Sequence, residues 1–144
     1  ENYRCAHLTL QLNQLQNVEL FHAGLGDQNQ EVQILVRNEA GKAMGGESLI
    51  LKENEHRKGG TETTRIVKID DVIPQDRHIS ILQLDVEGFE IPALTGAMET
   101  IKRCKPYIIL EFPPEDQWMD ENIYALGYKA TGKLHLNTVY SFEG

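Results

Sequence analysis

Two short apolar runs, separated by an amphipathic stretch, dominate the hydrophobic pattern of this chain. The runs Ile79–Leu84 and Tyr107–Phe112 are too short for buried helices and are typical of strands covered on both faces. Between them, four apolar residues recur at helical spacing: Ile91, Leu94, Met98 and Ile101. This spacing leaves Glu90 on the side of the helix that faces water. We expect this helix to begin near Phe89 and to end before Pro106. The pattern predicts a right-handed strand–helix–strand unit with parallel strands.

The rest of the chain alternates between the same two kinds of element. Leucines at helical spacing predict a helix over residues 1–16, and a second helix is expected over 115–126, with Gly127 as its left-handed cap. Strands are predicted at residues 18–25, 31–37, 64–69, 128–131 and 138–142. This alternation indicates an α/β fold that ends in two further strands.

The segment Asn38–Thr63 is rich in Gly, Glu and Lys and interrupts this alternation. Loops of this length are uncommon unless they are functional or disordered. We expect a long mobile loop, and two interpretations stay open: a lid over a substrate, or simple disorder. Its glycines do not follow the order of a phosphate-binding loop.

Composition narrows the class of protein. A chain of 144 residues with 40% hydrophobic residues is expected to form a single domain with a real core. Its formal net charge of −8 argues against a nucleic-acid partner, and no apolar stretch is long enough to predict a membrane span. Cys5 and Cys104 suggest no disulfide framework, so a cytoplasmic location is expected. The histidines show no metal-binding spacing, so no metal site is predicted.

Three carboxylates lie where the two apolar runs end. Asp85 closes the first run, Glu87 follows in the turn with Gly88, and Glu111 lies near the end of the second run. In open α/β sheets, ligands bind beyond the carboxyl ends of the strands. Asp85 and Glu87 therefore either take part in chemistry or cap the helix that follows them.

Several motifs in this region resemble one family. The sequences L-D-V-E-G-F-E, A-L-T-G-A and K-P-Y-I-I-L-E occur in that order, R-I-V-K-I-D-D-V-I precedes them, and the opening E-N-Y-R through H-A-G-L-G-D also fits. Together they are similar to FkbM-type methyltransferases, which transfer a methyl group from S-adenosylmethionine. The resemblance implies a Rossmann-like class I methyltransferase fold, with a mostly parallel central sheet and an antiparallel C-terminal pair.

The resemblance also implies roles for individual residues. Asp85 or Glu87 would orient or deprotonate a hydroxyl group on a sugar or another small metabolite, and Glu111 would line the pocket. The segment Ala23–Asp27, with Gly24, would border the adenine of the cofactor, and Asp27 would accept a hydrogen bond from its amino group. From spacing alone, a plain turn built by the glycines explains this segment equally well.

One part of the family pattern is not present in these 144 residues. The first two strands, the glycine-rich loop and the ribose-binding acid have no counterpart, because the Gly24-Leu25-Gly26 sequence precedes a predicted strand and not a helix. We therefore expect an N-terminally truncated domain that is inactive alone, and that associates with itself through exposed strand edges. The alternative is a non-catalytic, methyltransferase-like remnant that serves as a binding module.

Overall fold

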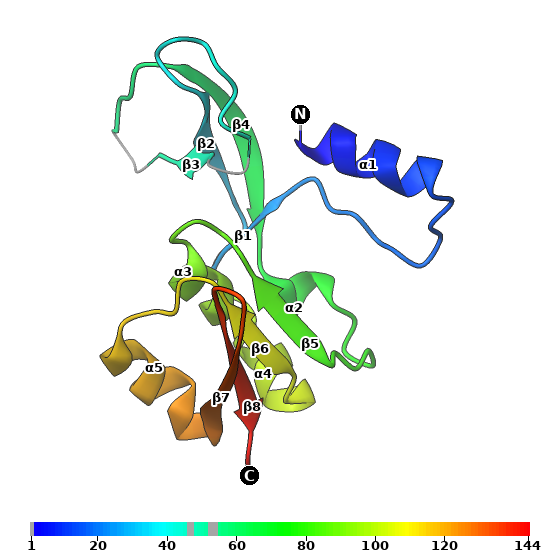
Figure 1. The fold of residues 1–144 in the computed structure, drawn as a ribbon, viewed down its shortest axis with the longest axis vertical. Coiled ribbons are helices and arrows are strands. Elements are labelled where there is room, and N and C mark those ends of the chain that lie inside the picture. Colours follow the sequence, from blue (N-terminus) through cyan, green and yellow to red (C-terminus); the bar gives the residue numbers. More distant parts are fainter. Residues whose placement is uncertain (1, 46–47, 52–54) are drawn as a thin grey trace. The chain divides into compact units, whose positions relative to one another are not determined.

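The computed structural model describes residues 2–45, 48–51 and 55–144, which form two compact units (Figure 1). Unit 1 comprises Glu1–Gly24 and Gln30–Ile66, and unit 2 comprises Leu25–Asn29 and Val67–Gly144. That the 144 residues form a single domain stays a prediction.

Unit 1 contains the first helix and most of the first sheet. The helix α1 spans Asn2–Leu12, and none of its residues is buried. The described strands of this sheet follow the order β1-β4-β2-β3, with bounds Gly24–Leu25 (β1), Gln30–Arg37 (β2), Leu49–Ile50 (β3) and Gly60–Val67 (β4). β2 runs antiparallel to both β3 and β4, which agrees with the alternating exposure predicted for residues 31–37.

Two predictions for unit 1 need correction. The strand predicted over residues 18–25 is limited to β1, because β1 is the outer strand of the sheet and residues 18–23 have no strand to pair with in the described chain. The loop predicted over 38–63 contains β3 and the start of β4, since Leu49 and Ile50 pair with Leu35 and Ile34. Residues 46–47 and 52–54 of that loop lie outside the described residues, and its mobility stays a prediction.

Unit 2 is organised around the second sheet. Its described strands follow the order β5-β6-β8-β7, with bounds Ile81–Leu84 (β5), Tyr107–Leu110 (β6), Tyr128–Leu134 (β7) and Asn137–Phe142 (β8). β5 and β6 are parallel, whereas β8 is antiparallel to both β6 and β7. The predicted parallel pair and antiparallel C-terminal pair are therefore confirmed.

One face of this sheet carries the core of unit 2. Ile108 and its register partner Tyr140 are buried on it, as are Leu84 and its partner Leu110. The helices that supply the rest of the core cluster are α3 (Glu90–Thr95), α4 (Met98–Cys104) and α5 (Asp116–Asn122). The opposite face was expected to be covered as well, but on it Ile81 and its register partner Tyr107 are 59% and 56% exposed.

The predicted helices are divided more finely than the sequence suggested. The crossover helix breaks at Gly96, whose carbonyl accepts a hydrogen bond from the backbone N–H of Asp70 at 2.9 Å. The predicted helix 115–126 is α5 followed by the 3-10 helix η2 (Tyr124–Leu126), and Gly127 ends it in the left-handed conformation, as expected. Ile69, predicted to end the strand 64–69, instead begins the short helix α2 (Ile69–Val72).

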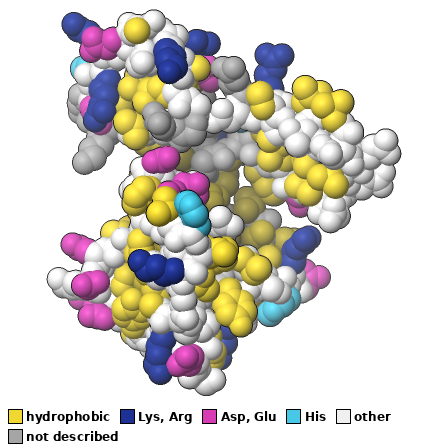
Figure 2. Space-filling view, in the orientation of Figure 1, with side chains coloured by type: hydrophobic (Ala, Val, Ile, Leu, Met, Phe, Trp, Pro, Cys, Tyr) yellow, Lys and Arg dark blue, Asp and Glu magenta, His cyan; other side chains and the backbone are white. Residues whose placement is uncertain are grey.

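The architecture is thus mixed α/β. In its described part, two four-stranded sheets take the place of the one mostly parallel sheet that was expected. The face of unit 2 shown in Figure 2 carries acidic side chains over α5. No helix in the described residues is long and apolar enough to cross a membrane.

Candidate functional site

The register of β5 and β6 brings two of the predicted acids together. Leu84 and Leu110 are paired in the parallel ladder and end their strands. Asp85 and Glu111 are the first residues after these two strands. The two carboxylates therefore emerge side by side at the carboxyl end of the sheet, where open α/β sheets bind their ligands. Asp85 is exposed and Glu111 is half-buried.

The turn after β5 has an unusual backbone. The N–H of Phe89 donates to the carbonyl of Val86 at 3.1 Å and closes the turn. Glu87 has a φ of 50° and Gly88 a φ of 88°, both in the left-handed region. That conformation costs a side-chain-bearing residue such as Glu87 about 1–2 kcal/mol, whereas glycine tolerates it. Strain of this kind is concentrated at functional sites.

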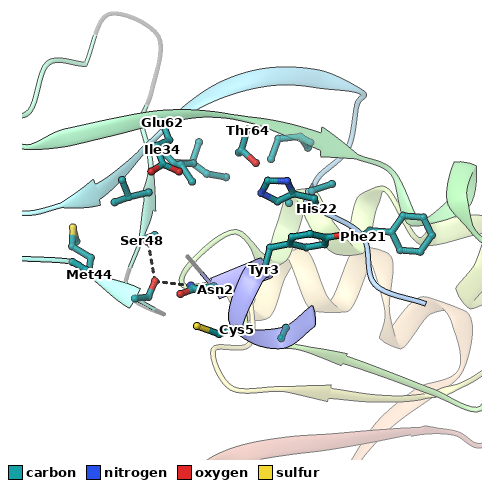
Figure 3. Close-up of a pocket in the computed structure, with 18 of the residues that line it drawn as sticks. Asn2, Tyr3, Cys5, Phe21, His22, Ile34, Met44, Ser48, Glu62 and Thr64 are labelled. Carbon is teal, nitrogen blue, oxygen red and sulfur yellow. Dashed lines mark hydrogen bonds between the residues drawn. The ribbon is translucent and has the colours of Figure 1, made fainter. Parts of the chain in front are cut away.

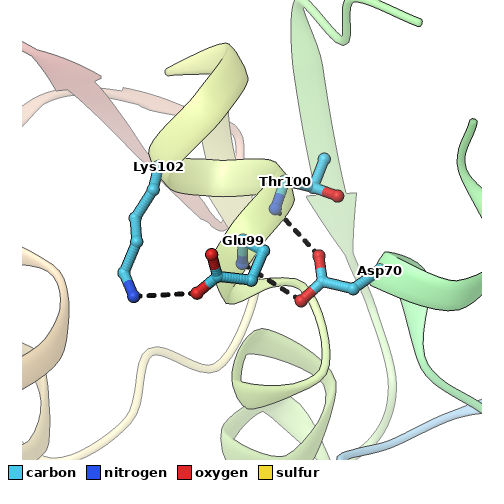
Figure 4. A network of polar contacts seen from close by, with 4 residues as sticks. All are labelled: Asp70, Glu99, Thr100 and Lys102. Atoms are coloured by element: carbon cyan, nitrogen blue, oxygen red, sulfur yellow. Dashed lines mark hydrogen bonds and ion pairs between the residues drawn. The ribbon is translucent and has the colours of Figure 1, made fainter. Parts of the chain in front are cut away.

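The structure argues against the capping interpretation of these acids. The N-cap position of α3 is Phe89, and no side chain makes a capping hydrogen bond there. The carboxylate that binds helix amides is Asp70, which accepts hydrogen bonds from the backbone N–H groups of Glu99 at 3.0 Å and Thr100 at 2.8 Å, in the first turn of α4 (Figure 4). Asp85 and Glu87 are therefore free of a capping role.

A fourth acid belongs to the same region, and its predicted exposure was wrong. Glu90 was expected to face water, but it is only 4% exposed, and its Oε1 has no hydrogen-bond partner among the residues that the structure describes. Burying such an oxygen without a donor costs roughly 1–3 kcal/mol. Its position was readable from the sequence, because Glu90 lies on the same helical face as Ala93, Leu94 and Ala97.

The acids at this end of the sheet influence one another. The pKa of Glu111 is raised above its ordinary value, first because partial burial removes water from the carboxyl group. A hydrogen bond with Asp85 and the negative charges of Asp85, Glu87 and Glu90 raise it further. Glu111 therefore holds its proton to a higher pH than a free glutamate, and the two neighbouring carboxyl groups can share that proton.

The predicted cofactor residues Ala23 and Gly24 lie on the wall of a cavity in unit 1. Its volume is about 670 Å³, within the range of roughly 300–1,000 Å³ that is typical of ligand pockets. Tyr3 and His22 stack on this wall with ring centroids 4.4 Å apart (Figure 3). Strands β2 and β4 and the loop after β2 supply other lining groups, among them Ile34, Met44, Ile66, Glu62 and Thr64.

The residue at position 24 in this wall must be glycine. A Cβ atom at this position would lie 2.8 Å from Cδ1 of Ile66, closer than real Cβ atoms approach a neighbour. The sequence indicated the segment but not Tyr3 and His22, because a stacked pair from two distant segments leaves no local pattern.

Asp27, the third predicted cofactor residue, belongs to unit 2 and does not line that cavity. Its loop is fixed by the N–H of Gly26, which donates to the carbonyl of Val67 at 3.1 Å. The loop also packs against the α3–α4 junction, since a Cβ atom on Gly96 would overlap the carbonyl oxygen of Gly26. Asp27 is therefore exposed to solvent, in a turn that these contacts hold in place.

Comparison with known proteins decides the family. Residues 2–130 match the methyltransferase FkbM domain. The chain belongs to the FkbM methyltransferase family. No curated protein and no solved structure matches it.

Membership of the FkbM family confirms the resemblance drawn from the motifs and gives the chemistry as methyl transfer. The matched region contains all the predicted site residues, from Ala23 to Glu111. Among the described residues, no group of three His, Cys, Asp or Glu side chains is arranged to hold a metal ion.

Proposed function

We propose that the FkbM domain described here transfers the methyl group of S-adenosylmethionine to a hydroxyl oxygen of a small metabolite or sugar. The observation that carries this proposal is the pair of carboxylates, Asp85 and Glu111, at the ends of adjacent parallel strands. A carboxylate in this position is suited to hold an acceptor hydroxyl and to take its proton. The Rossmann-like identity of the sheet is part of the same proposal.

The reaction needs little from the protein beyond positioning. The bond between sulfur and the methyl carbon breaks as a bond forms between that carbon and the acceptor oxygen, and the hydroxyl proton leaves. In this proposal Asp85 receives the proton and Glu111 binds the acceptor. Glu87, in the turn after β5, helps to orient the acceptor hydroxyl. Alignment of the reacting atoms supplies most of the acceleration.

The cofactor is assigned in the same proposal to the residues that the family pattern indicates. Ala23 and Gly24 would contact the adenosine portion from the wall of the cavity in unit 1. Asp27, in unit 2, is assigned to the adenine amino group by the family pattern alone. Stacked aromatic rings and apolar side chains, as in Tyr3, His22 and Ile34, suit a planar base. Because Cys5 and Cys104 are both free thiols, we place the protein in the cytoplasm.

The role of Asp85 is tested with a conservative substitution. Methyl transfer from labelled S-adenosylmethionine to a panel of hydroxyl compounds is measured for a longer version of the chain that also carries a glycine-rich loop, with and without Asp85→Asn. Loss of a general base should lower kcat by about 100-fold or more, with a smaller change in KM. Asp120→Asn, an exposed carboxyl group on α5, is the control and should retain full activity. Normal turnover by Asp85→Asn with a true acceptor would show that this role is wrong.

Cofactor affinity gives a second test. These 144 residues contain no glycine-rich loop that opens a helix and no matching ribose-binding acid, so we expect the chain alone to bind S-adenosylmethionine weakly and to be inactive. Each charged hydrogen bond that is missing is worth about 1.5–3 kcal/mol, or tenfold and more in affinity. Calorimetric titration measures this directly, and micromolar binding by the chain alone contradicts the expectation.

A further inference from the structure

Four carboxylates gather at the carboxyl end of β5 and β6, and none of them forms an ion pair with a described residue. Asp85 and Glu111 follow register partners, and Glu87 and Glu90 come from the turn and from the first residue of α3. The ion pairs found in the described residues, Arg57–Glu55, Lys102–Glu99 and Lys129–Glu143, involve none of these four acids. The negative charge of this end of the sheet is therefore not balanced by the described protein groups.

Glu90 provides an independent indication that a ligand group is needed. More than nine-tenths of this residue is buried, and its Oε1 finds no donor among the described protein groups. The negative charge of Glu90 is one of the causes that raise the pKa of Glu111, which places the Glu90 carboxylate in the same cluster. Buried polar atoms in native proteins almost always have a partner, so an orphaned acceptor beside a carboxylate cluster calls for a donor from outside the chain.

The chemistry of that donor is restricted by its surroundings. It must donate hydrogen bonds, because Glu90 and its neighbours offer acceptors, and a positive charge on it would be favoured by four nearby acids. A metal ion fits less well, because the described residues contain no set of three ligands arranged around one point. An ammonium group supplies both the positive charge and several donors.

We propose that this end of the sheet, comprising Asp85, Glu87, Glu90 and Glu111, binds an ammonium group of the methyl acceptor. The acceptor class is then an amino-substituted hydroxyl compound, such as an amino sugar. Asp85 remains next to the hydroxyl that is methylated, while Glu90 receives a hydrogen bond from the ammonium group. This inference rests on the proposed function, because it specifies the acceptor of the same reaction.

The test compares two probes that differ in one group. D-Glucosamine and D-glucose are titrated into the full 144-residue chain, and binding is followed by the amide resonances of residues 85–90 and 111. Glucosamine should bind at least about tenfold more tightly, and the preference should shrink as salt is raised. Glu90→Gln should weaken glucosamine binding by about tenfold and leave glucose binding unchanged. Glu115→Gln, an exposed acid outside the cluster, should change neither.

The remaining measurements make the outcome decisive. If Glu90→Gln does not fold, Asp85→Asn is used, because Asp85 is exposed and its substitution spares the core. Since Asp85 also lies next to the hydroxyl group, this variant should weaken the binding of both sugars, and that of glucosamine more. Equal affinity for the two sugars overturns the inference. The inference is also overturned if the amide resonances respond to L-methionine but neither to glucosamine nor to 4-(methylthio)butanoate, the deaminated counterpart of L-methionine. That result would assign the acids to the amino group of the cofactor.

Failure of the proposed function gives a different result. A chain, alone or extended, that prefers glucosamine but transfers no methyl group overturns the catalytic proposal and retains the ammonium site. Efficient methylation of neutral hydroxyl compounds, with no preference for amino-substituted ones, overturns the ammonium site and retains the catalytic proposal.

Discussion

At the scale of single residues, Asp70 makes the most consequential polar contacts in unit 2. Its carboxylate binds two backbone N–H groups in the first turn of α4, which have no partner inside the helix. Asp70→Ala should therefore lower the free energy of unfolding by about 1–2 kcal/mol. Asp76→Ala, in an exposed turn of the same unit, is the control and should change it by less than about 0.5 kcal/mol. Urea denaturation measures both, and equal effects would contradict the capping role.

Glu111 predicts a dependence of stability on pH. Because its pKa is raised in the folded protein, it favours folding fully below pH 4.5, the ordinary value, and this contribution is lost as the pH rises through the raised pKa. Glu111→Gln removes the titrating group. The Tm of the variant minus that of the wild type should therefore become more positive from pH 4.5 towards neutrality, as measured by thermal melts at several pH values. A difference that stays constant over this range would show that folding does not raise the pKa of Glu111.

The residues of the acidic cluster were only partly predictable from the sequence. Asp85, Glu87 and Glu111 were found because each lies at or just after the end of an apolar run, and the parallel register then places two of them side by side. Glu90 was missed because a charged residue is assumed to face water. Its burial depends on how α3 is rotated about its axis. The buried face carries Glu90 and Ala93, whereas the predicted buried face carried Ile91.

At the scale of elements, β5 determines whether unit 2 folds. Leu84 is 1% exposed in the core cluster, and its neighbour Gln83 is exposed on the other face of the same strand. Leu84→Asp should abolish cooperative unfolding, because a buried unpaired charge costs several kcal/mol against a total stability of about 5–15 kcal/mol. Gln83→Asp introduces the same side chain on the exposed face and should remain folded. Circular dichroism melts distinguish the two, and a cooperatively melting Leu84→Asp variant would show that β5 is misplaced.

Elements that a local sequence pattern specifies were predicted well, whereas features that depend on a distant partner were not. β5, β6 and the Gly127 cap are specified by short apolar runs and by one left-handed residue. The strand expected from Val18 to Leu25 has the right pattern, but only β1 finds a neighbour, β4, to pair with. The break at Gly96 has a tertiary cause, since only a residue without a side chain fits against Gly26.

At the scale of the whole molecule, the sheet of unit 2 has a surface that favours association with another chain. β5 is one of the two outer strands of this sheet, so one row of its backbone groups is unpaired in the described structure. The face beside it exposes Ile81 and Tyr107 and carries no charged residue on β5. Exposed apolar outer strands are templates for pairing with a second copy, and we propose self-association through this edge.

This proposal predicts that a single charge at the edge prevents association. Ile81→Lys should keep unit 2 folded, because the side chain is 59% exposed, and should shift the protein towards monomer. Leu134→Lys is the matched control: Leu134 is 61% exposed in β7, at the far side of the same sheet, so this variant should associate like the wild type. Sedimentation velocity over a range of concentrations measures the effect. A wild-type chain that stays monomeric at every concentration, or two variants that behave alike, would show that the β5 edge is not the interface. If Ile81→Lys alone dissociates the protein, the unpaired edge of β5 and its apolar face act together as one interface.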